Sequence, residues 1–542
     1  MAMSINKYIT VVAFAMCMVS CNDFLDKQPT EVPSETTFWQ KESDYESALA
    51  ACYNTLYNNL LSYDYPCLDG LTDNGMVRFD EGTYGSAETI GQGDLTPNTG
   101  GFVTGIYNSC YQGIARVHKM LEHLEKYTGT DISDETKTQW YGELHALRGY
   151  FYSLLYQFYR EVPLVTASQD YDNMYVPKAS RDEIRQQIIS DYDKAISELS
   201  DNLYYSSSSI GHFTKSAVQG LKARLLLFDA YDDQGNAISS KMKEIADLLK
   251  SIRPGYSLMP RLRDNFLSSK QAASTEIMFS VRFLQPNLLN NFDRHFGKWC
   301  CMTVSRNLID EFECTDGLSW NQSPLAVHPD EKVLYGGSFD AANEERAKLF
   351  QNRDPRLLQT VYYNQRMNFI SIGDEGGADG VKVNEDANLS PTNTGVAKYI
   401  ATFSSDITGD LISDQDFPIL RWAHVLLMLA ESENELNGPD ATALNAINEV
   451  RKRSNMPVIP SDVTKEELRQ RIRHEWRVET AFEGLRYFQM RRWKTIASIN
   501  GLKDPGWPAY SRVYKDAFYF LPIPQAEIDK SHGILIQDPN YE

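Results

Sequence analysis

The sequence predicts a mainly α-helical protein, a superhelix of tetratricopeptide-like helical hairpins that carries an irregular region of loops and short strands. Three observations lead to this prediction. Amphipathic segments of helical length come in pairs, small residues stand where paired helices would meet, and the stretch 275–415 lacks the helical period. Stacked helix pairs bury one continuous core. The strict repeat of about 34 residues is degenerate here, and insertions separate the pairs.

The composition is that of a globular protein. Of 542 residues, 42% are hydrophobic and 23% are charged, so the chain can bury a large core and is not disordered as a whole. The 73 acidic residues outnumber 53 basic ones, which gives a net charge of −20. This field repels phosphate backbones, and no basic patch with interleaved aromatics occurs. A nucleic-acid partner is therefore not expected.

The N-terminus predicts export. Residues 1–20 contain one charge, Lys7, followed by an apolar run that is too short to cross a bilayer, as in a signal peptide. The run ends in Met18-Val19-Ser20-Cys21, which resembles a bacterial lipobox. In that interpretation Cys21 is lipidated and anchors the mature chain to a membrane. The alternative is a plain cleaved signal with an incidental Cys21.

The first helix and a long loop follow the leader. Tyr45, Leu49 and Cys52 recur at helical spacing behind a capping box at Ser43-Asp-Tyr-Glu46, and they predict a helix up to about Leu60. Residues 70–105 are rich in glycine and predict a loop. Long loops in compact proteins are often functional. A helix resumes over 107–126.

Three helix pairs come next. They are predicted over 140–159 with 181–199, 217–231 with 240–252, and 421–437 with 441–453. A capping box, Ser180-Arg-Asp-Glu183, opens the second helix of the first pair. Small residues that would allow close packing are Ala146, Gly149, Gly220, Ala223, Ala423 and Ala430.

The middle of the chain has a different pattern. Residues 276–283 alternate as a strand does, and residues 373–396 are rich in Gly, Asp and Asn and predict a loop. We expect a partly β region laid over the helical scaffold.

The sequence offers no strong metal or redox motif. Six cysteines follow Cys21 without a Cys-x-x-Cys spacing, so we expect mostly free, buried thiols and one bridge at most. His474-Glu475 begins like a zincin motif, but the second histidine is missing. No cofactor is predicted. A structural Ca²⁺ at Asp232-Asp233, or at the trio Asp410, Asp414 and Asp416, is the alternative, although neither set has the spacing of a calcium loop.

Three glutamates near the C-terminus share one helix face. Glu475, Glu479 and Glu483 are four residues apart, with Arg486 and Arg492 close in sequence. Residues at this spacing are neighbours on a helix surface. The pattern favours an ion-pair network that joins helices over a catalytic role.

Several separated motifs occur in one order along the chain. They are Cys21-Asn-Asp-Phe-Leu-Asp26, His145-Ala-Leu-Arg-Gly-Tyr150, Glu161-Val-Pro-Leu164, Asn352-Arg-Asp-Pro-Arg-Leu357, Arg421-Trp-Ala423, Glu475-Trp-Arg477, Phe482-Glu-Gly-Leu-Arg486 and Phe520-Leu-Pro-Ile-Pro-Gln525. Through them the chain resembles the SusD/RagB family of outer-membrane nutrient-binding lipoproteins of Bacteroidetes. His424 and Arg116 depart from the family pattern, and both lie on predicted helices, where they bear on packing.

The resemblance implies a function without catalysis. Such proteins are lipid-anchored to the outer membrane, face the exterior, capture oligosaccharides, and act as a lid on a SusC-like TonB-dependent transporter. The implied domains are the signal peptide 1–20, an N-terminal region 21–230, the irregular region 231–415 and a C-terminal helical region 416–542. A peptide-binding lid of the same architecture and a surface glycoside hydrolase are the alternatives.

The ligand site is expected on loops, where sugars stack on aromatic rings and their hydroxyls meet polar side chains. Trp140, Trp422, Trp476 and Trp493 lie within predicted helices and are assigned to the core. In the family, the Gly-rich loop and the middle region together form a shallow platform. We hypothesise that Phe79, Tyr84, Phe296, Trp299 and Trp320 stack on ligand, while Arg78, Asp80 and Asn291 donate or accept hydrogen bonds. For each ring, burial in the loop's own packing is the alternative.

Overall fold

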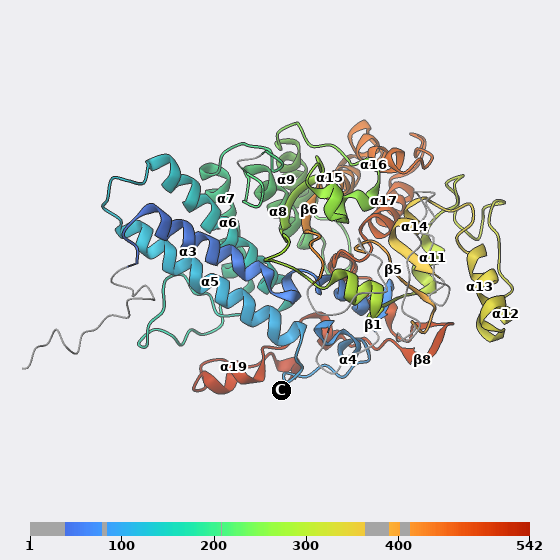
Figure 1. Cartoon of the computed structure of the whole chain (residues 1–542), viewed down its shortest axis with the longest axis horizontal. Helices are drawn as coiled ribbons and strands as arrows, with labels where there is room; N and C mark the ends of the chain where they lie inside the picture. Colours follow the sequence, from blue (N-terminus) through green and yellow to red (C-terminus); the bar gives the residue numbers. More distant parts are fainter. Residues whose placement is uncertain (1–37, 78–83, 207–208, 364–389, 401–411, 542) are drawn as a thin grey trace, which may run out of the picture.

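The protein is mainly helical, and its helices stack into one curved body (Figure 1). The computed structural model describes residues 38–77, 84–206, 209–363, 390–400 and 412–541. The predicted signal peptide and Cys21 lie outside these residues. The helices are α3 (Glu42–Asn54), α4 (Ala87–Gly91), α5 (Phe102–Lys126), α6 (Asp134–Phe158), α7 (Arg181–Glu198), α8 (Lys215–Phe228), α9 (Ser239–Lys250), α10 (Ser268–Gln271), α11 (Arg306–Glu311), α12 (Glu331–Gly336), α13 (Phe339–Lys348), α14 (Arg356–Thr360), α15 (Trp422–Asn437), α16 (Ala441–Arg453), α17 (Lys465–Thr480), α18 (Arg486–Arg492) and α19 (Gln525–Lys530).

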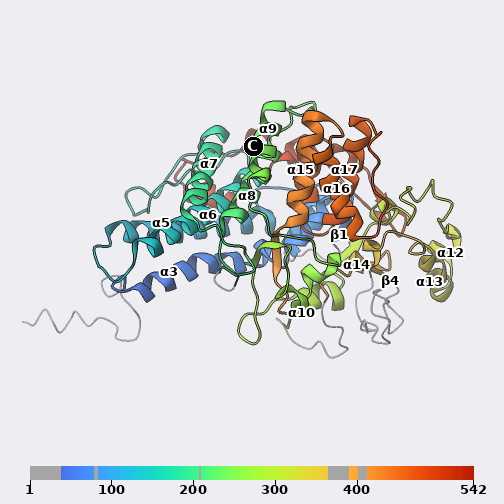
Figure 2. The ribbon, with the colours of Figure 1, turned by 90° about the horizontal axis from the view of Figure 1, so that it is seen from above.

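The three predicted helix pairs are confirmed. α6 packs on α7, α8 on α9, and α15 on α16, while α9 also contacts α15 and so joins the middle pair to the last. Figure 2 shows α15, α16 and α17 side by side above the sheet-bearing middle of the molecule. Gly149 allows α6 to approach α7, because a Cβ there would lie 2.9 Å from the Tyr192 ring; Gly220 instead faces a strand, since a Cβ there would lie 2.6 Å from Leu420 in residues 417–421.

Of the two capping boxes predicted from the sequence, the structure confirms one and contradicts the other. Ser180 caps α7, and Glu183 returns the bond to the Ser180 backbone, as the capping box predicts. The box predicted at Ser43 is wrong, because the cap of α3 is Lys41, two residues earlier, and the helix begins at Glu42. The carboxylate of Asp44 accepts from the Lys41 backbone N–H at 3.1 Å. The local acidic residue therefore sets this helix start.

The residues that the structure describes form four two-stranded antiparallel sheets, which lie among the helices. They pair β1 (Gly75–Val77) with β3 (Met302–Val304), β2 (Ile277–Val281) with β6 (Phe417–Arg421), β4 (Val361–Tyr363) with β5 (Thr394–Val396), and β7 (Lys503–Asp504) with β8 (Trp507–Ser511). The strand predicted over 276–283 is β2. The loop predicted over 70–105 also contains β1 and α4, because non-local pairing with β3 orders it.

The three glutamates lie in a buried ion-pair network, as predicted, but they do not share one helix face: α17 ends at Thr480, so Glu483 lies in the turn that follows it. Glu475 accepts from Arg451 at 3.0 Å and also bonds Arg356, Glu479 accepts from Arg356 at 3.1 Å and Arg421 at 3.2 Å, and Glu483 accepts from Arg421 at 2.7 Å and Lys398 at 2.9 Å. Neighbouring cations hold the pKa of Glu483 well below its usual range. The expected partners Arg486 and Arg492 instead bind Asp73 at 2.7 Å and Glu431 at 2.6 Å.

The two departures from the family pattern have packing roles. His424 Nε2 donates to Glu483 at 2.9 Å, and its Nδ1 accepts from Arg224 at 2.9 Å. Burial and the nearby Arg421 lower the pKa of His424 to about 3, so the ring is neutral. Arg116 on α5 donates to the Ala51 carbonyl at 2.8 Å and thereby ties α5 to α3.

The cysteines of the described residues are buried and unbridged: Cys52, Cys67, Cys110, Cys300, Cys301 and Cys314. Within the same residues there is no cluster of His, Cys, Asp or Glu able to hold a metal ion. Asp232 accepts the backbone N–H groups of Gln234 and Asn236 and so closes a turn. No helix among the described residues has the length and apolarity needed to span a membrane.

Candidate functional site

The described part of the predicted site centres on Trp299, which ends a short π-helix, η6 (Asp293–Lys298). The indole is half-buried, so part of its surface meets solvent. The guanidinium carbon of Arg294 lies 4.0 Å from the Trp299 ring centroid, and the His295 ring stacks on the indole at 5.7 Å and 17°. A π-turn places residues five apart one above the other, which brings Arg294 to Trp299. The result is a rigid aromatic ring with a cation beside it.

A buried hydrogen bond holds the His295 imidazole, on which the Trp299 indole stacks. His295 Nδ1 donates to Asp64 Oδ1 at 2.8 Å, and the two side chains are 8% and 4% exposed. The edges of Tyr84 and Tyr63 meet the imidazole at 5.0 Å and 5.7 Å. Three segments that are distant in sequence therefore meet at His295. Because an aromatic ring held on several sides loses little freedom on binding, such support favours ligand stacking.

Phe296 supports the turn from below. It is 1% exposed, with its ring 6.0 Å from Phe292 and 5.7 Å from Tyr399. The Tyr362 hydroxyl donates to the Phe296 carbonyl at 2.8 Å. In the structure this ring belongs to the core under the site, which is the alternative that the sequence left open.

The predicted residues fall into three groups. Arg78, Phe79 and Asp80 lie outside the described residues. Tyr84 is 6% exposed and lies with His295 and Trp299, and burial raises the pKa of its phenol. Asn291 and Trp299 are half-buried on the same turn region. The structure thus brings Tyr84, Asn291 and Trp299 into one neighbourhood.

Trp320 has a different set of neighbours. It is 5% exposed, lies 4.3 Å from the His328 ring, and sits under the guanidinium groups of Arg306 at 5.0 Å and Arg353 at 5.5 Å. Its ring contacts in the described residues share no partner with those of Trp299. Its indole N–H is buried without an acceptor among the described residues.

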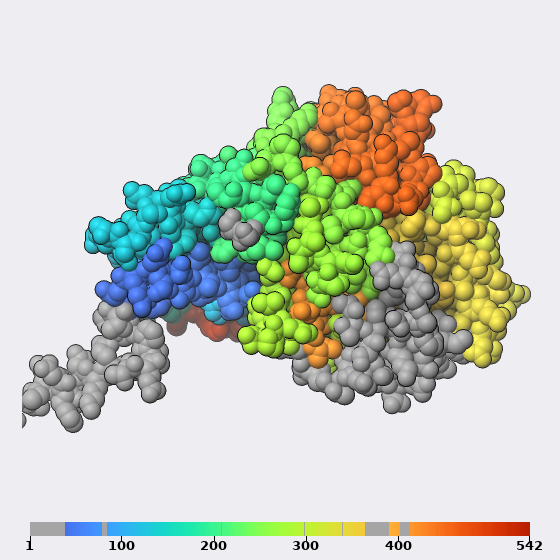
Figure 3. Space-filling view, turned by 45° about the horizontal axis from the view of Figure 1, so that its top comes forward, coloured from blue at the N-terminus to red at the C-terminus, as the bar shows by residue number. Residues whose placement is uncertain are grey.

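Sequence reasoning left Arg294, His295, Tyr63 and Asp64 out of the site. Arg294 and His295 lie five and four positions before Trp299. This spacing is typical of a helical turn, and it could have placed both residues beside Trp299. Asp64 is 231 residues from His295, and no local pattern links them. In the space-filling view, the yellow-green residues near 280–300 lie between the N-terminal helices, coloured blue to green, and the later segment coloured yellow (Figure 3).

The carboxylates near Trp299 serve the scaffold. Asp64 bonds His295 and also accepts from Asn59 at 2.6 Å, while Asp293 accepts from the Ser413 hydroxyl at 3.0 Å. Both are almost fully buried. A retaining or inverting glycosidase needs two carboxyl groups that flank a bound sugar. These two carboxylates instead hold η6 in place.

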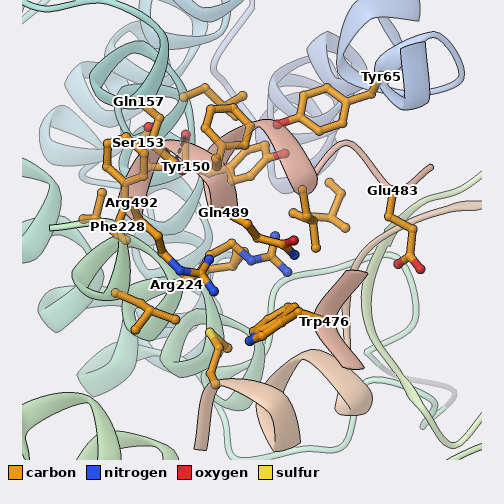
Figure 4. A pocket seen from close by; sticks show the side chains of 18 of the residues that line it. Tyr65, Tyr150, Ser153, Gln157, Arg224, Phe228, Trp476, Glu483, Gln489 and Arg492 are labelled. Carbon is orange, nitrogen blue, oxygen red and sulfur yellow. Dashed lines mark hydrogen bonds between the residues drawn. The ribbon is translucent and has the colours of Figure 1, made fainter. Parts of the chain in front are cut away.

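An enclosed cavity between α6, α8, α15, α17 and α18 is too small for a sugar (Figure 4). Its volume is about 40 Å³, room for roughly three water molecules. Arg224 Nε and Gln489 Oε1 line it without a hydrogen-bond partner among the described residues. Water can accept from the first and donate to the second, so the cavity fits buried water better than a ligand.

Two family models match separate parts of the chain. Residues 280–541 match the model of the SusD family, and residues 23–227 match a model described as starch-binding associating with outer membrane. Together they span both ends of the described structure.

Relatives and solved structures match along nearly the whole length. SusD-like proteins P38 and P25 of Formosa agariphila are 24% and 23% identical, over 91% and 99% of this chain and 93% and 99% of the relatives. A SusD-like carbohydrate-binding protein of Bacteroides fragilis has a TM-score of 0.74 at 22% identity, over 93% of this chain and 100% of that one. Surface glycan-binding protein A of Bacteroides thetaiotaomicron, solved with laminarihexaose, has a TM-score of 0.65 at 19% identity, over 93% and 100%. These likenesses show a common fold.

Proposed function

The chain belongs to the SusD/RagB family, and from this premise we propose that it captures oligosaccharides at the cell surface and passes them to a TonB-dependent outer-membrane transporter. Members of this family are carbohydrate-binding proteins and not enzymes. Surface carbohydrate binding is the part of the proposal that the comparisons support. Delivery to a transporter goes beyond the comparisons and is our own proposal.

The observation that carries the glycan site is the half-buried ring of Trp299 beside Arg294. A sugar presents C–H groups on one face and hydroxyls around its edge. In this proposal the exposed part of the indole stacks on the C–H face, and Arg294 and Asn291, both half-buried on the same turn region, bond hydroxyls. Tyr84 acts by holding His295, which in turn stacks on the indole. We further propose that Arg78, Phe79 and Asp80, which follow β1, contact the same ligand.

Trp320 is proposed as a member of the ligand site only on family resemblance. Its ring is covered by two guanidinium groups and His328. For it to stack on a sugar, Arg306 or Arg353 would have to move. Comparing Trp299 with Trp320 by substitution therefore separates a surface site from a site that opens.

Attachment at the outer membrane is proposed through Cys21. The lipobox-like sequence in front of it predicts diacylglyceryl and acyl chains on this residue. Several chains together anchor firmly where one anchors marginally. Metabolic labelling with a lipid precursor would mark the wild type and leave Cys21→Ser unlabelled.

Calorimetry on purified protein tests glycan binding. A panel of laminarihexaose, maltohexaose and a tetrapeptide separates glycan from peptide ligands. We expect Trp299→Ala to weaken binding of the preferred glycan by at least tenfold. Trp422→Ala is the matched control, because Trp422 is also half-buried but stacks on Tyr256 at the start of α15. Binding unchanged in Trp299→Ala, or hydrolysis of the glycan during titration, would contradict the proposal.

A further inference from the structure

Half of the large apolar side chains that the described residues expose gather on two neighbouring loops. One loop precedes α7 and carries Tyr171, Met174 and Tyr175, which are 86%, 43% and 37% exposed. The other follows α19 and carries Ile534 and Ile536, which are 39% and 62% exposed. The Tyr175 ring meets His532 at 5.0 Å and 89°, so the loops touch. We call these five side chains the loop patch. Contiguous apolar patches of this kind mark interaction surfaces.

A groove of about 790 Å³ runs between the two loops and the side of α5. Tyr107 and Tyr111 of α5 form one wall, and Met174, Tyr175 and Leu535 form the others. The Tyr111 hydroxyl donates to the Pro163 carbonyl at 2.6 Å and holds α5 against the first loop. α19 lies along the same edge of the molecule as α5 in Figure 1. The groove is large enough for side chains of a partner.

The charge around the groove indicates which kind of partner it would attract. Asp170, Asp172 and Asp529 are exposed and have no ion pair within the described part of the chain. Lys530 binds Glu527 at 2.8 Å, which neutralises that pair. The rim is therefore acidic. An anionic lipid surface would be repelled, whereas a basic protein segment would be attracted.

The chemistry of the loop patch separates it from the glycan site. Three of its five side chains are aliphatic (Met174, Ile534 and Ile536) and offer a sugar no flat ring and no hydroxyl partner, while Tyr175 packs edge-on against His532. Apolar anchors with a charged rim are typical of protein–protein contacts. The patch also shares no residue with the Trp299 cluster, so both could be occupied together.

We propose that the loop patch docks an extracellular loop of the transporter, one that inserts an apolar side chain into the groove and places Lys or Arg against the acidic rim. This inference rests on the proposed delivery function and names its contact surface. It leaves the glycan site open while the partner is bound.

Co-purification tests the proposal. The tagged full-length chain is isolated in mild detergent from outer membranes that contain its transporter, and the transporter is quantified per chain by mass spectrometry. We expect Met174→Ser/Tyr175→Ser and Ile534→Ser/Ile536→Ser each to reduce its yield at least tenfold. Leu318→Ser/Leu325→Ser is the control, since these residues are 39% and 41% exposed but lie elsewhere, and it should match the wild type. Asp172→Lys/Asp529→Lys should also reduce the yield severalfold.

Glycan calorimetry on the same variants keeps the two proposals apart. Patch variants are expected to keep wild-type glycan affinity, which also shows that they fold. Wild-type transporter yield in the patch variants, or an equal loss in the control, would overturn this inference and leave glycan capture standing. A wild-type dimer that the patch variants lose, with the transporter retained, would reassign the surface to a second copy. A wild type that brings no transporter would overturn both delivery and its contact surface.

Discussion

His295 and Asp64 join the π-turn of the proposed glycan site to the first helical region through a bond of 2.8 Å from imidazole Nδ1 to carboxylate Oδ1. The bond is buried, and it spans 231 residues of chain. The Trp299 indole stacks on the same imidazole. The position of the proposed stacking ring thus depends on a carboxylate from another part of the fold.

Asp64→Ala should therefore weaken both folding and glycan binding. It leaves the His295 N–H and the Asn59 amide without an acceptor, at a cost of about 1–3 kcal/mol in the free energy of unfolding. Asp64→Asn keeps one acceptor oxygen and should lose less. Urea unfolding and calorimetry measure the two effects. Wild-type glycan affinity in a folded Asp64→Ala protein would show that His295 does not position Trp299.

Glu479→Gln should be strongly destabilising. Glu479 is fully buried and bonds Arg356, Arg421 and Arg453, so removing its charge leaves buried guanidinium groups uncompensated. The expected loss is about 3–5 kcal/mol in the free energy of unfolding. Asp247→Ala is the control, because it breaks a pair with Lys243 in which both side chains are well exposed, and it should cost less than about 1 kcal/mol. Similar losses in the two variants would argue against the network as a source of stability.

Asp416→Asn should change the pH dependence of folding. Burial is the main cause that raises the pKa of Asp416 from 3.8 to about 6, although the Phe283 N–H and Arg282 oppose it. The folded state holds this proton more tightly, so the stability that the carboxyl contributes is complete below about pH 4 and is lost as pH rises through 6. Relative to the wild type, Asp416→Asn should gain up to about 3 kcal/mol between pH 4 and pH 7. Urea unfolding of both proteins at the two pH values checks this, and a constant difference would contradict it.

The buried thiols should resist modification in the native protein. Burial raises the pKa of Cys52 to about 12, and the other five described cysteines are equally inaccessible. Alkylation followed by mass spectrometry should leave all six unlabelled until the protein is unfolded. A reducing agent should not shift the melting temperature. A drop of several degrees on reduction would reveal a bridge that the structure does not contain.

Much of the helical scaffold follows from local signals. The bounds of α7, α15 and α16 agree with their predicted ranges to within one residue, because apolar spacing, caps and a terminal Gly438 all act within a few residues. The strand β1 escaped prediction because only its partner β3, more than two hundred residues later, gives it structure. Short strands in a Gly-rich segment carry little pattern of their own.

The glycan site was harder to predict than the scaffold. Trp299 and Asn291 are half-buried, but Phe296, three residues before Trp299, is core. Ring type alone cannot separate a stacking residue from a packing residue, since both are apolar and sit on irregular segments. The backbone of the π-turn separates the two, because it packs Phe296 against Tyr399 and leaves Trp299 half-buried.

Residues near the start and near the end of the chain hold each other through hydrogen bonds and an ion pair. Asp69 accepts from the backbone N–H of Phe482 at a separation of 413 residues, Asp73 binds Arg486 at the same separation, and Arg512 bonds the Gly70 carbonyl. Loops of this length close slowly, and their contacts form only when both ends are present. The N-terminal helices therefore lack their final supports until synthesis has reached the last few dozen codons. If the predicted leader directs export, such late completion favours assembly after translocation over assembly before it.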